Sequence, residues 1–179
     1  MPNYDKLAAQ AKKCGFTHSA PLDVATLEYR QDIRDMCNAQ QCNKYGTNWS
    51  CPPVCKTLEE IREQAKAFTH GLLVQTVGDL EDSYDWEGIT ETGKRHKTNF
   101  AKLWGELKKD HETIFAMGAG ECKLCQTCTY PDNPCRHPDR MEISMEACGL
   151  YVSEVCKDNN LKYNYGPNKI AFTSCYLLP

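Results

Sequence analysis

Three features are missing from this 179-residue sequence: a long apolar run, an excess of basic charge, and a leader-like start. No apolar run approaches the ~20 residues that a transmembrane helix needs. The net charge of −3 gives no electrostatic basis for binding nucleic acid or an anionic membrane. The first residues, Met-Pro-Asn-Tyr-Asp, contain no basic region followed by an apolar stretch. We therefore expect a cytoplasmic protein that binds neither nucleic acid nor a membrane.

Signatures of familiar enzyme chemistry are missing too. Neither Gly-x4-Gly-Lys nor Gly-x-Gly-x2-Gly occurs around Gly118-Ala-Gly120, so no phosphate-binding loop is predicted there. The 5 histidines are scattered, and none lies in a hydrolase signature that would pair a nucleophile with a base. The sequence therefore names no reaction and leaves open whether the protein is an enzyme.

Cysteine is abundant instead, with 12 in the chain. In a reducing cytosol, clustered thiols indicate metal binding or redox chemistry rather than disulfides. The even count also fits a disulfide framework, but such frameworks are typical of small secreted domains.

The most informative segment is residues 122–138, where three cysteines recur at every third position and a fourth follows. Cys-x2-Cys-x2-Cys is how the bacterial ferredoxin run begins, which favours an iron–sulfur site. Structural zinc more often uses two separated Cys-x2-Cys pairs, and it remains the alternative. Arg136 and His137 directly follow the last cysteine and are candidates to donate to cluster sulfur or to bind an anionic partner; they can equally be a surface pair that caps the loop. The predicted ligands of this second cysteine loop are Cys122, Cys125, Cys128 and Cys135.

Residues 37–55 form a first cysteine loop with no periodicity. A structureless segment of this length is uncommon inside a domain unless it folds around something. Trp49 and Tyr45 are candidates for an apolar shield. We predict a second metal site here; the alternative is a loop that only packs against the other cysteines. Its predicted ligands are Cys37, Cys42, Cys51 and Cys55.

The rest of the chain predicts one α+β domain over residues 1–179, with a small β-sheet, several packed helices and the two cysteine-rich metal-binding loops. Apolar spacing predicts helices by the 3.6-residue period, and a short apolar run between glycines predicts a buried strand. The expected elements are helices over 3–14, 24–36 and 98–117, a surface loop over 79–93, a strand over 71–77 and a hairpin over 162–178.

These residues resemble a family of small cysteine-rich proteins from anaerobic bacteria and archaea, known as predicted metal-binding proteins of unknown function. The resemblance rests on three segments and extends over about residues 14–178. They are Tyr45-Gly46 through Trp49-x-Cys51-Pro52-Pro53, Cys122-x-Leu124-Cys125-x2-Cys128 through Pro134-Cys135-Arg136-His137-Pro138, and Ser144-Met145-Glu146-Ala147 with Gly149. The resemblance implies seven of the eight cysteines above as ligands, whereas Cys55 is an addition to the pattern.

These observations predict an iron–sulfur protein with two [4Fe–4S] clusters. Such clusters serve one-electron transfer, either in a carrier or in a redox accessory to an anaerobic enzyme, and both roles require a redox partner protein. Two alternatives remain open: a zinc-stapled interaction module, in which metal supplies only folding energy, and an iron–sulfur enzyme with one iron open to substrate.

Overall fold

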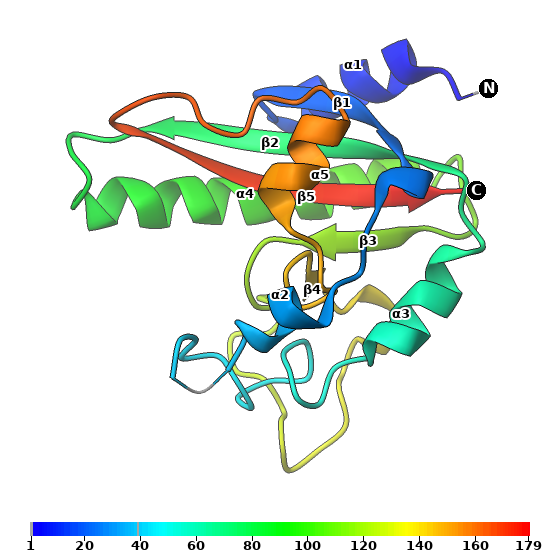
Figure 1. Cartoon of the computed structure of the whole chain (residues 1–179), viewed down its shortest axis with the longest axis vertical. Helices are drawn as coiled ribbons and strands as arrows, with labels where there is room; N and C mark the ends of the chain where they lie inside the picture. Colours follow the sequence, from blue (N-terminus) through cyan, green and yellow to red (C-terminus); the bar gives the residue numbers. More distant parts are fainter. Residues whose placement is uncertain (1, 39) are drawn as a thin grey trace.

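The computed structural model describes residues 2–38 and 40–179. Its centre is one five-stranded sheet in the order β1-β2-β5-β3-β4 (Figure 1). Neighbouring strands run antiparallel, except that β4 runs parallel to β3. The strands are β1 (His18–Asp23), β2 (His70–Asp79), β3 (Phe115–Gly118), β4 (Ile143–Ser144) and β5 (Lys169–Leu178).

Alternate residues of the two longest strands face opposite sides of the sheet, as the two-residue period of a strand requires. Leu72 and Val74 on β2 pack on one side, whereas Leu73 packs on the other. Both sides are covered, which is why almost every position of β2 is buried. The sheet therefore separates two apolar cores.

One core lies under α1 (Tyr4–Cys14) and α4 (Trp86–Leu107). The opposite core lies under α3 (Leu58–Ala65) and α5 (Val152–Asp158). Three short elements complete the chain: η1 (Val24–Thr26), α2 (Gln31–Asp35) and η2 (Pro138–Arg140). No helix of the described residues is both long and apolar enough to cross a membrane.

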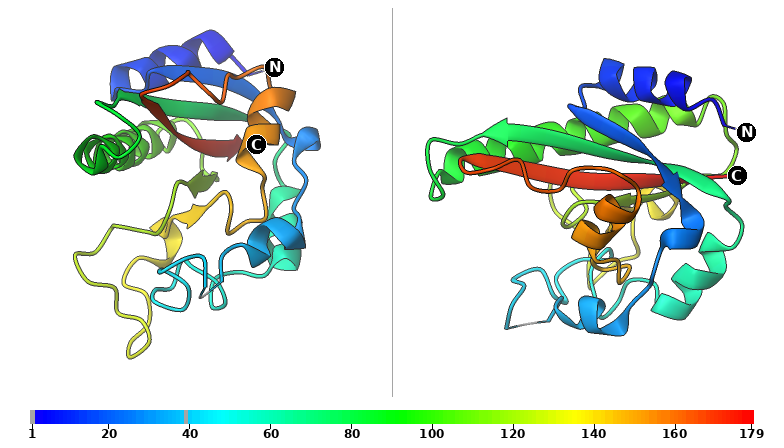
Figure 2. Two further views of the ribbon diagram at one scale, coloured as in Figure 1. Left: turned by 60° about the vertical axis from the view of Figure 1, so that its left-hand side comes forward. Right: turned by 45° about the horizontal axis from the view of Figure 1, so that its top comes forward.

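The two cysteine loops lie side by side at one end of the molecule, on the α2 and α3 side and away from α1 and α4. Figure 1 and the left view of Figure 2 show them there, as the cyan and yellow segments. With residue 39 set aside, neither loop contributes a strand to the sheet, and both consist of turns and irregular backbone. The sheet and its helices thus form a base on which the cysteine loops are mounted.

The α+β class is confirmed, and so is the first helix, which ends at Gly15 with a φ of 104°. The helix predicted over 98–117 was wrong at both ends. Asp85 caps α4 by accepting a hydrogen bond from the Gly88 amide at 2.8 Å, so the helix begins inside the acidic segment predicted as a loop. Beyond Leu107 the apolar pattern belongs to β3. The acidic residues of the segment predicted as a loop therefore include the N-cap of a helix, a position where Asp is favoured.

Two further predictions were wrong because tertiary contacts override local pattern. The helix over 24–36 is split into η1 and α2, and between them the Arg30 amide donates to the Gly149 carbonyl. The hairpin over 162–178 does not form, because β5 pairs with β2 and β3 instead. The segment before β5 is held by side chains, with the Tyr165 hydroxyl donating to Gln75 Oε1 at 2.7 Å.

Candidate metal centre

The first cysteine loop folds back on itself through short backbone hydrogen bonds. The Cys42 amide donates to the Asn38 carbonyl at 2.8 Å, and the Gly46 amide donates to the Pro52 carbonyl at the same distance. Gly46 has a φ of 63°, a left-handed conformation that costs glycine little. These turns bring together cysteines that are up to 18 positions apart in the sequence.

The four thiols of the first loop lie close enough to influence one another electrostatically. Burial, together with negative charge on Cys42, Glu146, Cys51 and Cys55, raises the pKa of Cys37 to about 11. Such mutual repulsion is what makes a group of thiols favourable for a cation, because a bound metal ion removes the penalty of placing thiolates together.

Two buried donors reach the sulfurs of this loop. Asn48 Nδ2 lies 3.3 Å from Cys51 Sγ, and Arg34 Nη2 lies 3.4 Å from Cys55 Sγ. Burial raises the pKa of both thiols, while these donors act in the opposite direction and lower it. The loop therefore contains groups that stabilise negative charge on sulfur, as a ligand thiolate requires.

The second cysteine loop surrounds a cavity. All four predicted ligands line it, together with Arg136 and His137, and its volume is about 300 Å³, at the lower end of the range for small-molecule and cofactor sites. Trp49 from the first loop forms part of its wall. The four cysteines that define it are Cys122, Cys125, Cys128 and Cys135.

Backbone amides point toward the sulfurs of this second loop. The His137 amide donates to Cys135 Sγ at 3.4 Å. Burial raises the pKa of Cys122, and hydrogen bonds from the amides of Glu142 and Leu124 oppose that rise. Donors of this kind tune the potential of iron–sulfur clusters.

Arg136 and His137 are both exposed and both line the cavity. Arg136 Nη1 donates to the Thr127 carbonyl at 3.0 Å, which closes the loop across nine residues. The structure therefore brings the pair to the cysteine cavity, and it gives Arg136 a loop-capping contact as well.

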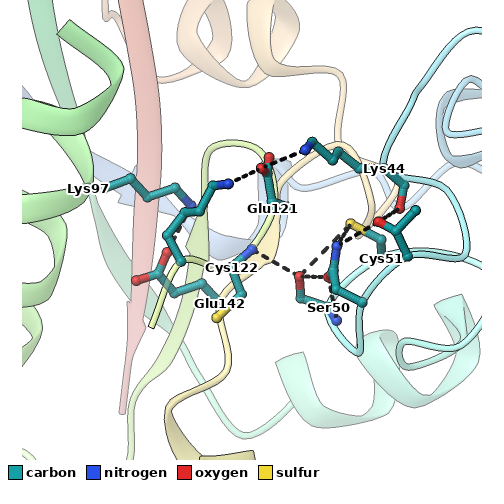
Figure 3. Close-up of polar contacts among 10 residues, drawn as sticks. Lys44, Ser50, Cys51, Lys97, Glu121, Cys122 and Glu142 are labelled. Carbon is teal, nitrogen blue, oxygen red and sulfur yellow. Dashed lines mark hydrogen bonds and ion pairs between the residues drawn. The ribbon is translucent and has the colours of Figure 1, made fainter. Parts of the chain in front are cut away.

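The two loops touch through polar contacts (Figure 3). The Cys122 amide donates to Ser50 Oγ at 3.0 Å, and Ser50 Oγ donates to Asn48 Oδ1 at 2.6 Å. Because Asn48 also donates to Cys51, a buried chain of hydrogen bonds runs from one cysteine loop to the other.

Further contacts hold the loops against each other at their outer side. Lys44 forms an ion pair with Glu121 at 3.3 Å. Trp49 Nε1 donates to the Asn133 carbonyl at 3.0 Å, and its ring meets Tyr130 edge-on with the centroids 5.0 Å apart. Tyr45 lines a separate groove beside Cys37. The predicted aromatic shield thus divides, with Trp49 at the second loop and Tyr45 at the first.

A nearly buried ion pair ties the second loop to the base. Lys97 on α4 lies 2.8 Å from Glu142, whose side chain is 4% exposed (Figure 3). Since the Glu142 amide is one of the donors to Cys122, this pair positions the backbone beside the first cysteine of the run.

All twelve cysteines lie within the described residues and are free thiols. Cys14, Cys148, Cys156 and Cys175 are buried in the two cores and lie outside the loops. Among the described residues, no group of three or more His, Cys, Asp or Glu side chains is placed to hold a metal ion. The thiols of the second loop are instead distributed around the cavity wall. Thiolates are soft ligands, which suit zinc, copper(I) and iron–sulfur clusters in general.

Several supporting residues were not predicted from the sequence. Asn48, Ser50 and the pair of Lys97 with Glu142 have no motif of their own, since their roles depend on contacts between distant segments. The one available signal is the position of Asn48 and Ser50 immediately before Cys51. Polar residues next to a ligand cysteine are reasonable candidates for donors to its sulfur.

The sequence was compared with known protein families, curated proteins and solved structures. The sequence matches the model of a family described as Predicted metal-binding protein (DUF2284) over residues 20–178. The chain belongs to this family. No curated protein and no solved structure matches it. The matched range contains both cysteine loops and all five strands except the first two residues of β1.

Proposed function

We propose that this member of the DUF2284 family binds two iron–sulfur clusters of the [4Fe–4S] type, one in each cysteine loop, and serves in cytoplasmic electron transfer. The observation that carries the proposal is the cavity lined by all four cysteines of residues 122–135. Thiolates spaced around a cavity, with backbone amides directed at sulfur, are the environment that such clusters require.

The residues that would hold the clusters are the eight cysteines of the two loops. Bound there, each cluster would supply reversible one-electron chemistry. The chain itself contributes donors to sulfur from Asn48, Arg34 and the His137 amide. Trp49, at the junction of the loops, limits access of water to the cavity.

The contacts between the loops favour a relay. Cys122 and Cys51 belong to different predicted sites, and the buried Ser50 and Asn48 connect them. Two redox groups in adjoining loops of one small domain can accept an electron at one and release it at the other. A redox partner protein would dock near the second cavity, where Lys44, Lys123 and Arg136 outnumber Glu121.

The experiment is anaerobic purification followed by analysis of iron, acid-labile sulfide and zinc. We expect a brown protein with broad absorption near 400 nm, iron and sulfide in equal amounts, and a paramagnetic signal after reduction with dithionite. A colourless folded protein that contains zinc would contradict the proposal and support the zinc-stapled module.

A matched control separates ligand thiols from core thiols. Cys128→Ser removes a thiol from the cavity wall, and we expect it to lower the iron content. Cys14→Ala removes a buried thiol between α1 and α4, and we expect unchanged iron content. Equal iron loss in both variants would mean that the cavity cysteines are not ligands.

A further inference from the structure

Arg34 is a buried arginine whose surroundings suit an anion. Arg34 lies in α2, and only 8% of the residue's surface is exposed. It donates to the carbonyls of Ala147 and Cys55 and to Cys55 Sγ, the last at 3.4 Å. Its own carbonyl accepts a hydrogen bond from the Cys37 amide at 2.9 Å. Arg34 therefore touches both ends of the first cysteine loop.

A charge of opposite sign, the exposed Glu60 carboxylate, acts on Arg34 only at a distance. Among the described residues, none of the ion pairs includes Arg34. By contrast, the neighbouring Arg30 pairs with Asp32 at 2.7 Å and with Glu154 at 3.0 Å at the surface. A buried cation is costly unless an anion accompanies it. Of the atoms that accept from Arg34, the two carbonyls are neutral, and Cys55 Sγ is the one that becomes anionic when it binds metal.

We propose that Arg34 is the residue that positions Cys55, the fourth cysteine of the first site, and balances the charge of its thiolate. This inference rests on the proposed iron–sulfur function and deepens it. It assigns a closed, four-thiolate site to the first loop, which is the form suited to electron transfer rather than to substrate binding at an open iron. It also gives the chain's additional cysteine, Cys55, a specific role.

The inference has an energetic consequence for the first site. Reduction adds negative charge to a cluster, and a fixed buried cation nearby favours the reduced form. In the second loop Arg136 is exposed, so water and salt screen its charge. Arg34 therefore gives the first site a higher reduction potential than the same site would have without this charge.

The test uses Arg34→Met, Arg34→Lys and Cys55→Ser in the full chain, with Arg30→Met as the matched surface control. Each protein is purified anaerobically, analysed for iron and sulfide, and titrated with dithionite while paramagnetic signals are recorded. For Arg34→Met we expect one of the two reduction potentials to fall by about 59 mV. For a one-electron couple, this is about a tenfold change in the equilibrium constant for reduction. Arg34→Lys keeps the charge and should retain most of the wild-type potential. Arg30→Met should change neither potential.

Cys55→Ser provides an independent readout that does not depend on the stability of the Arg34 variants. We expect loss of one of the two paramagnetic signals, or its conversion to a different signal, with the other unchanged. Full iron content with both signals intact in Cys55→Ser would overturn the inference, as would unchanged potentials in Arg34→Met. Absence of iron and sulfide from the wild-type protein is a different result, since it would remove the proposed function itself.

Discussion

The sheet half and the cysteine half of this molecule are stabilised in different ways. In the sheet half, β2 and β5 pair over ten positions, and apolar side chains cover both faces. In the cysteine half, the described residues of 37–55 and 122–138 contain no strand or α-helix, and individual polar contacts hold them. Burial of apolar surface stabilises the first half, whereas the second depends on a few hydrogen bonds and on what its thiols bind.

Removing the metal should give the largest difference between the two halves. We expect chelation under reducing conditions to abolish amide protection in residues 37–55 and 122–138, because their thiolates then repel one another. The amides of β2 and β5 should stay protected, since their ladder does not involve the loops. Hydrogen exchange with mass spectrometry measures both regions in one experiment. Loss of protection across the sheet would show that the halves are not separable.

Lowering the pH should weaken the sheet half through a buried histidine. His96 on α4 lies between two hydroxyls, with Nδ1 3.0 Å from Thr76 Oγ1 and Nε2 2.7 Å from Ser174 Oγ. Burial, with a smaller contribution from Lys97, lowers the pKa of His96 to about 3. The unfolded chain takes up this proton near pH 6.5, and the folded chain does so only near pH 3.

The contribution of His96 to the free energy of unfolding is therefore fully present above pH 6.5. It is lost as the pH drops from there toward 3, by on the order of 4 kcal/mol in total. Denaturant unfolding of the metal-free protein at several pH values measures this slope. His96→Gln cannot take up the proton and should show a smaller slope. An identical slope in both proteins would assign the pH dependence to other groups.

Cutting the link between the halves should have the next largest effect. Lys97→Met leaves the Glu142 carboxylate buried without its partner, and we expect a loss of about 3 kcal/mol in the free energy of unfolding. Because Glu142 also holds the backbone at Cys122, iron content should fall in the same variant. The double variant Lys97→Met with Glu142→Leu removes both charges and should recover much of the stability. Equal destabilisation by the single and double variants would contradict this account.

A smaller change should act within the cysteine half alone. Ser50→Ala removes the acceptor for the Cys122 amide and the donor to Asn48. We expect a loss of about 1–2 kcal/mol in the free energy of unfolding, since the partly buried Cys122 amide is left unsatisfied. Exchange at the Cys122 amide should accelerate, while exchange in β2 stays as in the wild type. Thr47→Ala is a control for loss of a loop hydroxyl that does not contact the Cys122 amide. Thr47 is exposed, and its hydroxyl donates to the Lys44 carbonyl and accepts from Asn48 Nδ2 at 3.3 Å.

The sequence was informative wherever one segment determines its own structure. The helix ending at Gly15, the α+β class and the two irregular cysteine segments follow from local spacing and composition. It was uninformative where distant segments meet. Three features depend on tertiary contacts that no local pattern contains. They are the contact of Arg34 with Cys55, the hydrogen bond from Cys122 to Ser50, and the break in the helix predicted over 24–36. The ligand set itself stays a prediction from spacing and family resemblance.

The most direct test of the account is quantitative iron and acid-labile sulfide analysis of two variants beside the wild type, all prepared without oxygen. Cys51→Ser interrupts the first loop and Cys125→Ser interrupts the second. If each loop holds one cluster, each variant should lose about half of the iron and sulfide, and the double variant nearly all. Wild-type iron in both single variants, or a folded wild type with neither iron nor sulfide, would contradict the central claim.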